Sequence, residues 1–260
     1  MDFLLAYLIL GLMAGFVAGL LGVGGGLIIV PILVWLFEAQ GITQHAMHLA
    51  LGTSLASILF TSMSSLRAHH ARGAVDWLTV KRIAPGIVAG TLLGAILAAR
   101  LSAMPLKIFF VAFLFYAAVQ MWWNFKPDAH RQLPGIAGMF GAGSIIGAIS
   151  SWVGIGGGTL SVPFQLWCNV PLHRAIGTSA AIGLPIALAG AAGYALSGSG
   201  HAIPGTWGYL HLTALACIAL GSISTAPLGA RVAHALPVGR LKRIFALLLF
   251  ALAIRMAWTF

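Results

Sequence analysis

Apolar segments about as long as a bilayer is thick recur along the whole sequence. A helix needs about 20 apolar residues to cross the hydrocarbon core, and runs close to this length are separated here by short polar turns. Only 7% of the 260 residues are charged, too few to cover the surface of a soluble domain. The runs do not alternate as the strands of a membrane barrel do. The sequence therefore predicts an all-α polytopic membrane protein that lies in a lipid bilayer.

The remaining composition argues against several other classes. The net charge of +10 does not indicate nucleic acid, because the basic residues lie one to four at a time in short turns, where they act as topology signals. With four acidic residues in the chain, we expect no paired-carboxylate enzyme, no metal site and no cofactor. The first apolar run lacks a basic leader and a small-residue cleavage site, so we expect it to be retained.

A short glycine-rich motif occurs twice, each time inside an apolar segment. Gly22–Pro31 and Gly154–Pro163 are identical at six of ten positions, four of which are glycines. Two more pairs of segments align, namely His48–Ala56 with His173–Ala181 and Gly94–Lys107 with Gly229–Lys242. We predict an internal duplication, with a first repeat over residues 1–125, a linker over 126–134 and a second repeat over 135–260.

The basic residues indicate how the two repeats are oriented. If each glycine-broken segment crosses the membrane once, the 14 Lys and Arg divide seven to seven between the two sides. If each broken segment turns back at its glycines, the division is eleven to three, an asymmetry that the positive-inside rule favours. We therefore predict two inverted-topology repeats, each a glycine-broken hairpin plus three transmembrane helices, with both termini outside the cytoplasm. A full crossing paired with a short return gives the same sidedness.

The glycine breaks are the first candidates for a binding site. Irregular backbone at membrane depth is tolerated only where it is buried in protein or lines a wet cavity. Each break starts a helical piece whose free N–H groups and positive dipole end face the break, and secondary transporters bind anions in this way. The alternative is close packing through small residues, which explains three consecutive glycines less well. The glycines expected to bind are Gly22, Gly24, Gly25, Gly26, Gly154, Gly156, Gly157 and Gly158.

Polar side chains near the breaks are further candidates. Hydroxyls at matching places in both repeats belong to Thr53, Ser54, Thr178 and Ser179, which either donate to an oxyanion or bond within their own helices. Trp152 and Gln165 flank only the second break, where they suit one head group bound off-centre or serve packing. His48 and His173 also match. They either carry a proton in coupled transport or lie at span ends as interfacial residues.

On the two glycine motifs and the two Gly-Thr-Ser blocks, the sequence resembles the TauE/SafE family of sulfite exporter-type membrane transporters. The resemblance covers nearly the full length and includes Gly73-Ala-Val-Asp76-Trp77 before the third span. The second half reads Pro204-Gly205-Thr206-Trp207 there, so we expect that helix capping by Asp76 is not duplicated.

The resemblance implies a function. It implies a secondary transporter, an exporter in the bacterial inner membrane, of a small sulfur-containing anion such as sulfite or an organosulfonate. The alternative is a channel or facilitated-diffusion pore for a small anion or neutral solute. An enzyme ranks last because no nucleophile–base pair is evident, and nothing in the sequence indicates an oligomeric state.

Overall fold

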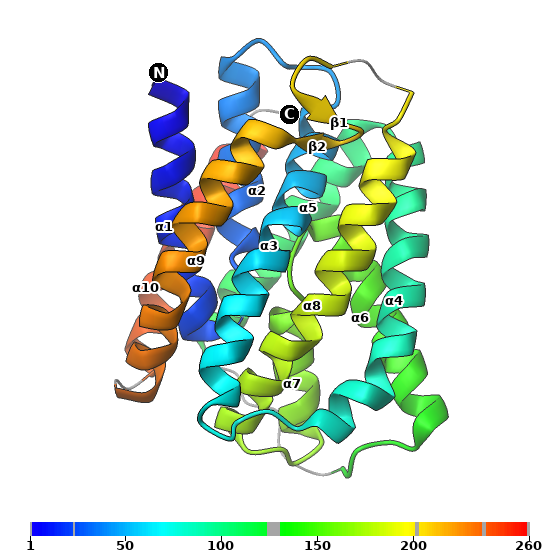
Figure 1. The fold of residues 1–260 in the computed structure, drawn as a ribbon, viewed down its shortest axis with the longest axis vertical. Coiled ribbons are helices and arrows are strands. Elements are labelled where there is room, and N and C mark those ends of the chain that lie inside the picture. Colours follow the sequence, from blue (N-terminus) through cyan, green and yellow to red (C-terminus); the bar gives the residue numbers. More distant parts are fainter. Residues whose placement is uncertain (1, 23, 124–130, 201–202, 236–237, 259–260) are drawn as a thin grey trace.

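The computed structural model is a bundle of helices around two broken helical hairpins (Figure 1). It describes residues 2–22, 24–123, 131–200, 203–235 and 238–258. The helices of the first half are α1 (Asp2–Leu21), α2 (Gly26–Ala39), α3 (Ala46–His70), α4 (Trp77–Arg100) and α5 (Ala103–Trp122). Those of the second half are α6 (Ile136–Val153), α7 (Gly158–Trp167), α8 (Leu172–Ser197), α9 (Leu212–Ala235) and α10 (Val238–Ala257). A two-stranded ribbon, β1 (Thr206–Trp207) with β2 (Leu210–His211), precedes α9.

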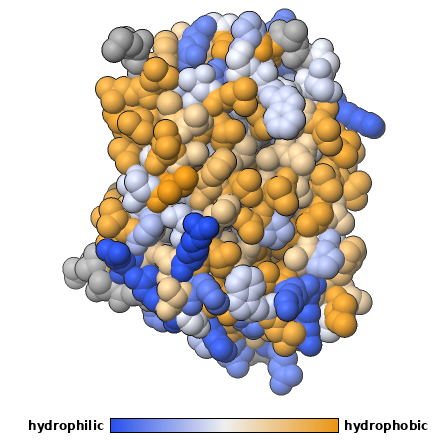
Figure 2. Space-filling model, in the orientation of Figure 1, coloured by the Kyte–Doolittle hydropathy of each residue, from blue (hydrophilic) through white to orange (hydrophobic). Residues whose placement is uncertain are grey.

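Most of these helices are suited to a membrane. In the part of the chain that the structure describes, seven helices are long and apolar enough to cross one, and α2 is a shorter apolar helix. Figure 2 shows a belt of hydrophobic residues between two more hydrophilic ends. The prediction of an all-α polytopic membrane protein is confirmed. The helix α10 is not among these seven; it contains Arg240, Lys242, Arg243 and Arg255, and it packs along α5.

Both glycine-broken segments turn back on themselves. Tyr7 near the start of α1 packs against Phe37 near the end of α2, with ring centroids 6.4 Å apart. In the second half, the guanidinium of Arg131, just before α6, lies 4.6 Å from the ring centroid of Trp167 at the end of α7. The two helices of each pair are therefore antiparallel, as the predicted hairpins require.

The packing of glycines shows the direction of the other helices. Gly15 and Gly19 of α1 lie against Ser222 and Ala226 of α9, so these helices are parallel. The helices α4 and α6 are parallel through three matching contacts, Gly86 with Phe140, Gly90 with Ser144 and Gly94 with Ala148. The helices α3 and α8 are antiparallel, because Ser62 meets Gly183 while Leu55 meets Gly190.

These directions relate the two halves by inversion. Helix α3 runs parallel to α9, since Thr53 bonds to His211 and Thr61 to Ser222. Helix α8 runs parallel to α4, since Gly177 lies against Ala74 and Gly193 against Ala95. Hence α1, α3 and α9 point one way, whereas α6, α8 and α4 point the other way. Each helix of the first half is opposed to its counterpart in the second, and α1 packs mainly on α9 of the other repeat. The exact repeat boundaries stay a prediction.

The basic residues gather at one end of the bundle. The end where α3 and α9 finish, called the basic end below, holds Arg67, Arg72, Lys81, Arg82, Arg131, Arg174, Arg231, Lys242 and Arg243. The opposite end holds Arg100, Lys107 and Arg255. Helix α1 begins and helix α10 ends at this opposite end (Figure 1). Lys126 and part of the predicted linker lie outside the described residues. The charge asymmetry and the shared end of the termini agree with the hairpin topology.

Candidate functional site

The two glycine breaks lie against each other inside the bundle. Gly25 and Gly157, which precede α2 and α7, adopt left-handed φ angles of 78° and 75°. A Cβ atom on Gly24 would lie 2.9 Å from the Cα of Gly156. The backbones of the two repeats approach this closely because neither residue has a side chain.

The helices α2 and α7 start with the same hydrogen-bond pattern. Ile29 donates its N–H to the carbonyl oxygen of Gly25 (3.2 Å), and Ser161 donates to that of Gly157 (2.7 Å). Ile28 and Leu160 donate to the same two carbonyl oxygens, at 3.1 and 3.0 Å. The amides before them begin the first turn, where intrahelical acceptors are lacking. The positive ends of two oppositely directed helices therefore lie at the junction of the breaks.

Serines from the long helices hold the breaks in place. Ser54 of α3 donates its hydroxyl to the carbonyl oxygen of Gly154 (2.7 Å), and Ser179 of α8 donates to that of Gly22 (3.3 Å). Ser161 Oγ lies 2.8 Å from Ser179 Oγ. Each repeat thus fixes the break of the other through a buried hydroxyl.

The matching threonines hold the starts of two further helices. Thr53 Oγ1 accepts the backbone N–H of His211 before α9, and Thr178 Oγ1 accepts that of Asp76 before α4, both at 2.9 Å. These hydroxyls are completely buried and have backbone partners. Their observed role is to join one repeat to the other.

Helix capping is duplicated, so the expectation that Asp76 has no counterpart is wrong. Asp76 Oδ1 accepts the N–H of Thr79 (3.3 Å) at the start of α4, and His211 Nδ1 accepts that of Ala214 (3.2 Å) at the start of α9. The segment equivalent to Gly73–Trp77 is therefore Gly208–Leu212 rather than Pro204–Trp207. Comparison of the motifs missed this equivalence, because His and Asp are different residue types even though an imidazole nitrogen and a carboxylate oxygen can both accept the capping hydrogen bond.

The two capping residues have shifted pKa values. Burial tends to raise the pKa of Asp76, but hydrogen bonds from Thr79 and Leu78 and the charge of Arg174 outweigh it, so this pKa lies below its usual value. Burial lowers the pKa of His211. A lowered pKa favours the neutral imidazole that the N–H of Ala214 requires as acceptor.

A small cavity separates the two breaks, and Gly22, Gly24 and Gly156 contribute to its wall. Its volume is about 10 Å³, which is roughly the room for one water molecule. The rest of the wall comes from α1, α3 and α8 through Ala18, Thr61, Ser62, Ser65, Ser179, Ala180 and Gly183. The side-chain oxygen of Ser65 is buried and has no hydrogen-bond partner. An unpartnered buried hydroxyl is costly unless a bound molecule uses it.

The cavity includes only part of the predicted set. Gly22, Gly24, Gly156 and Ser179 line it. The remaining glycines, Gly25, Gly26, Gly154, Gly157 and Gly158, shape the breaks around it. Sequence reasoning missed Thr61, Ser62 and Ser65, although the run Thr61-Ser-Met-Ser-Ser65 inside an apolar span was a visible signal.

Trp152 and Gln165 do not line the cavity. Trp152 Nε1 donates to the carbonyl oxygen of Gly94 (2.9 Å), so its ring faces α4. Gln165 is fully buried, and its Nε2 donates to the carbonyl oxygen of Ser161 (3.1 Å) while its Oε1 lacks a partner. Gln165 is therefore linked to the cavity indirectly: it bonds to Ser161, and the hydroxyl of Ser161 bonds to that of Ser179, which lines the cavity.

The two matching histidines lie at opposite ends of the bundle. His48 is buried near the start of α3, where its Nε2 lies 3.0 Å from the carbonyl oxygen of Leu101 and its ring stacks on Tyr209. His173 is exposed at the start of α8, at the basic end. Neither lines the cavity, so a proton-carrying role for them stays a prediction.

Known proteins are similar to this chain over most of its length. The profile of the sulfite exporter TauE/SafE family matches residues 7–256. A probable membrane transporter protein of Haemophilus influenzae is 36% identical over 260 residues, which is 98% of each chain. The probable membrane transporter protein YunE of Bacillus subtilis is 28% identical and covers 76% of this chain and 83% of its own length. No solved structure matches the chain.

Proposed function

Because the chain belongs to the sulfite exporter TauE/SafE family and is a membrane transporter, we propose that it exports a small sulfur-containing anion, sulfite or an organosulfonate. It acts as a secondary transporter by alternating access around the cavity between the breaks. It resides in a bacterial inner membrane, where the positive-inside rule puts the basic end in the cytoplasm and both termini outside.

One observation carries this proposal. The glycine breaks that precede two oppositely directed helices, α2 and α7, line a cavity whose wall also includes the buried, unpartnered hydroxyl of Ser65. Backbone N–H and hydroxyl groups are donors, so the site suits the oxygens of an anion. None of the described residues in the cavity wall is basic, so the anion is bound without a salt bridge and can leave again.

The size of the cavity bears on the mechanism. A volume of about 10 Å³ is smaller than a sulfite ion, so the anion enters only when the surrounding helices separate. Helices α3 and α8 meet at the cavity from opposite repeats, through Ser62 and Gly183. Rocking of one repeat against the other would open this contact toward one side at a time.

Transport into proteoliposomes tests the proposal. We would measure uptake and counterflow of sulfite, thiosulfate, sulfate, sulfoacetate, taurine, acetate and chloride. We expect saturable uptake and counterflow for one of the sulfur anions. Linear flux without counterflow indicates the alternative, a facilitated-diffusion pore, and transport of a neutral solute alone contradicts an anion site.

A variant ties the activity to the cavity. In Gly183→Ala the added methyl group would lie 2.7 Å from Ser62 Oγ and 3.3 Å from the carbonyl oxygen of Gly156, so it occupies the cavity. We expect this variant to fold and to lose uptake. Gly141→Ala is the matched control, because a methyl group there meets nothing within 4 Å. Full uptake by Gly183→Ala would place the substrate elsewhere.

A further inference from the structure

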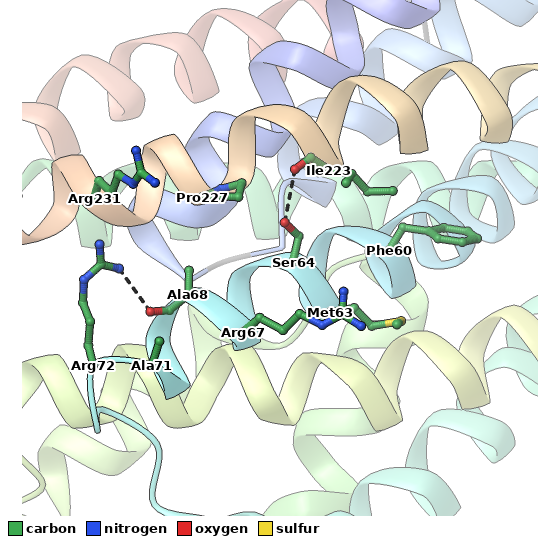
Figure 3. A pocket seen from close by; sticks show the side chains of 10 residues that line it. All are labelled: Phe60, Met63, Ser64, Arg67, Ala68, Ala71, Arg72, Ile223, Pro227 and Arg231. Carbon is green, nitrogen blue, oxygen red and sulfur yellow. Dashed lines mark hydrogen bonds between the residues drawn. The ribbon is translucent and has the colours of Figure 1, made fainter.

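A larger groove opens at the basic end between α3 and α9 (Figure 3). Its volume is about 530 Å³, and Arg67, Arg72 and Arg231 line it. None of the described residues that line the groove is acidic. Three positive charges with no carboxylate among these lining residues attract anions and raise their local concentration.

Two adjacent residues of α3 connect the groove with the central cavity. Ser64 lines the groove, and its hydroxyl donates to the carbonyl oxygen of Ile223 of α9 (3.1 Å; Figure 3). Ser65 lines the cavity, as does Thr61, whose hydroxyl donates to Ser222 Oγ (2.8 Å). The contact between α3 and α9 at this depth therefore contains two hydroxyl-mediated hydrogen bonds, which a passing anion can replace with its own.

The other repeat has no such polar route. When α3 is aligned with α8 on the Gly-Thr-Ser blocks, the residues in place of Thr61, Ser62, Ser64 and Ser65 are Ile186, Ala187, Ala189 and Gly190. When α9 is aligned with α4 on Gly229 and Gly94, Ile87 and Ile96 replace Ser222 and Arg231. A duplicated fold would supply this chemistry twice if packing alone required it. Its presence on one side only indicates a function specific to the basic end.

We propose that the groove between α3 and α9 is the entrance to the central cavity from the basic end, and that Arg67, Arg72 and Arg231 bind the oxyanion there first. The direction of travel rests on the proposed function, whereas anion binding in the groove does not. The phosphate of an anionic lipid has the same oxyanion chemistry, and Phe60 and Met63 add apolar surface to the groove. The experiment must therefore separate a free anion from a lipid head group.

Charged thiol reagents test the groove independently of transport. Cys168 and Cys217 are replaced by Ser, and Ser64→Cys places one thiol in the groove. The protein is placed in phosphatidylcholine liposomes and modified with an anionic sulfonatoethyl or a cationic trimethylammonioethyl methanethiosulfonate, each rate being normalised to that of a free thiol. We expect the anionic reagent to react about tenfold faster, from the basic end only.

Arginine variants assign the preference to the groove. Arg67→Gln with Arg231→Gln removes it, whereas the charge-keeping pair Arg67→Lys and Arg231→Lys retains it. Arg82→Gln is the matched control, since Arg82 lies at the basic end and is not among the residues lining the groove. Equal normalised rates, or a preference that survives the double Gln change, would overturn the inference.

Two further measurements separate the remaining outcomes. Phosphatidylglycerol is added to liposomes that contain either Ser64→Cys or Ser64→Cys with the double Gln change. The negative surface potential of this lipid slows the anionic reagent equally in both, so the ratio of their rates reports the arginines alone. A preference that persists supports an entrance for free anions, whereas its loss shows a lipid head group on the arginines and overturns the entrance. If the wild-type protein transports none of the sulfur anions while the preference remains, the proposed function fails and the anion site in the groove stands.

Discussion

Ser54 on α3 donates its hydroxyl to the carbonyl oxygen of Gly154, 100 residues further along the chain, at 2.7 Å. Its counterpart Ser179 on α8 makes the same kind of bond to Gly22. Both serines are completely buried. The conformation of each glycine break therefore depends on a long helix of the other repeat, and a shift of α3 against α8 must change both breaks.

Removing the Ser54 hydroxyl should destabilise the protein. In Ser54→Ala the carbonyl of Gly154 loses its buried donor, which costs about 1–3 kcal/mol. Unfolding in detergent measures this loss. Ser144→Ala is the control, because Ser144 is only half-buried and donates to the carbonyl oxygen of Phe140 on its own helix, and we expect its effect to stay within about 0.5 kcal/mol. Equal stabilities of the two variants would contradict the role given to Ser54.

A methyl group at the junction of the breaks should be harmful. In Gly26→Ala the added Cβ would lie 2.0 Å from the carbonyl oxygen of Gly154, which belongs to buried backbone and cannot move aside as a side chain can. The two breaks must move apart, so we expect a loss of at least about 1–3 kcal/mol together with the loss of uptake. Gly141→Ala, in open space on α6, should keep both. The unfolding temperature and the transport rate of the two variants decide this.

The hairpins and their inversion could be predicted because their signals are local. The glycine motif occurs twice at the same place in each repeat, and the basic turns record which side each loop takes. Both signals are independent of side-chain packing. They also sufficed to select Gly22, Gly24 and Gly156, which line the cavity.

The polar side chains of the cavity could not be selected in the same way. A hydroxyl inside a transmembrane helix usually bonds to its own backbone, and Ser57 of α3 does so by donating to Ser54. Whether Ser62 and Ser65 face the centre depends on how α3 packs against α8. For Thr53 and Thr178, anion binding and a bond within the helix were equally open from the sequence. Their hydroxyls instead accept the N–H groups of His211 and Asp76 from other helices, which is a tertiary property.

The unpartnered hydroxyl of Ser65 should affect function more than folding. Its oxygen has no hydrogen-bond partner in the protein to lose, so Ser65→Ala should leave stability unchanged or slightly raised. Uptake of the transported anion should fall about tenfold, because one donor to a buried charge is lost. Ser150→Ala is the matched control, since Ser150 is also buried without a partner but is not among the residues lining the cavity. If both variants transport at the wild-type rate, Ser65 does not contact the substrate.

The cap at His211 makes the stability depend on pH. Because burial lowers the pKa of His211 in the folded protein, the unfolded chain takes up this proton first, at its pKa of about 6.5. The stabilisation is complete above that pKa and is lost as the pH falls below it. In His211→Asn the amide oxygen can accept the N–H of Ala214 and does not titrate. We therefore expect wild type to lose more of its unfolding temperature than His211→Asn between about pH 7 and pH 5.

The equivalent cap at Asp76 provides the control for this pH dependence. The pKa of Asp76 is lowered in the folded protein, so its contribution is complete above the unfolded pKa of about 3.9 and is lost only as the pH falls through the lower folded value. Asp76→Asn should therefore differ from wild type by the same amount at pH 7 and at pH 5. Identical pH profiles for wild type and His211→Asn would show that the imidazole of His211 does not act as the cap of α9 in the membrane.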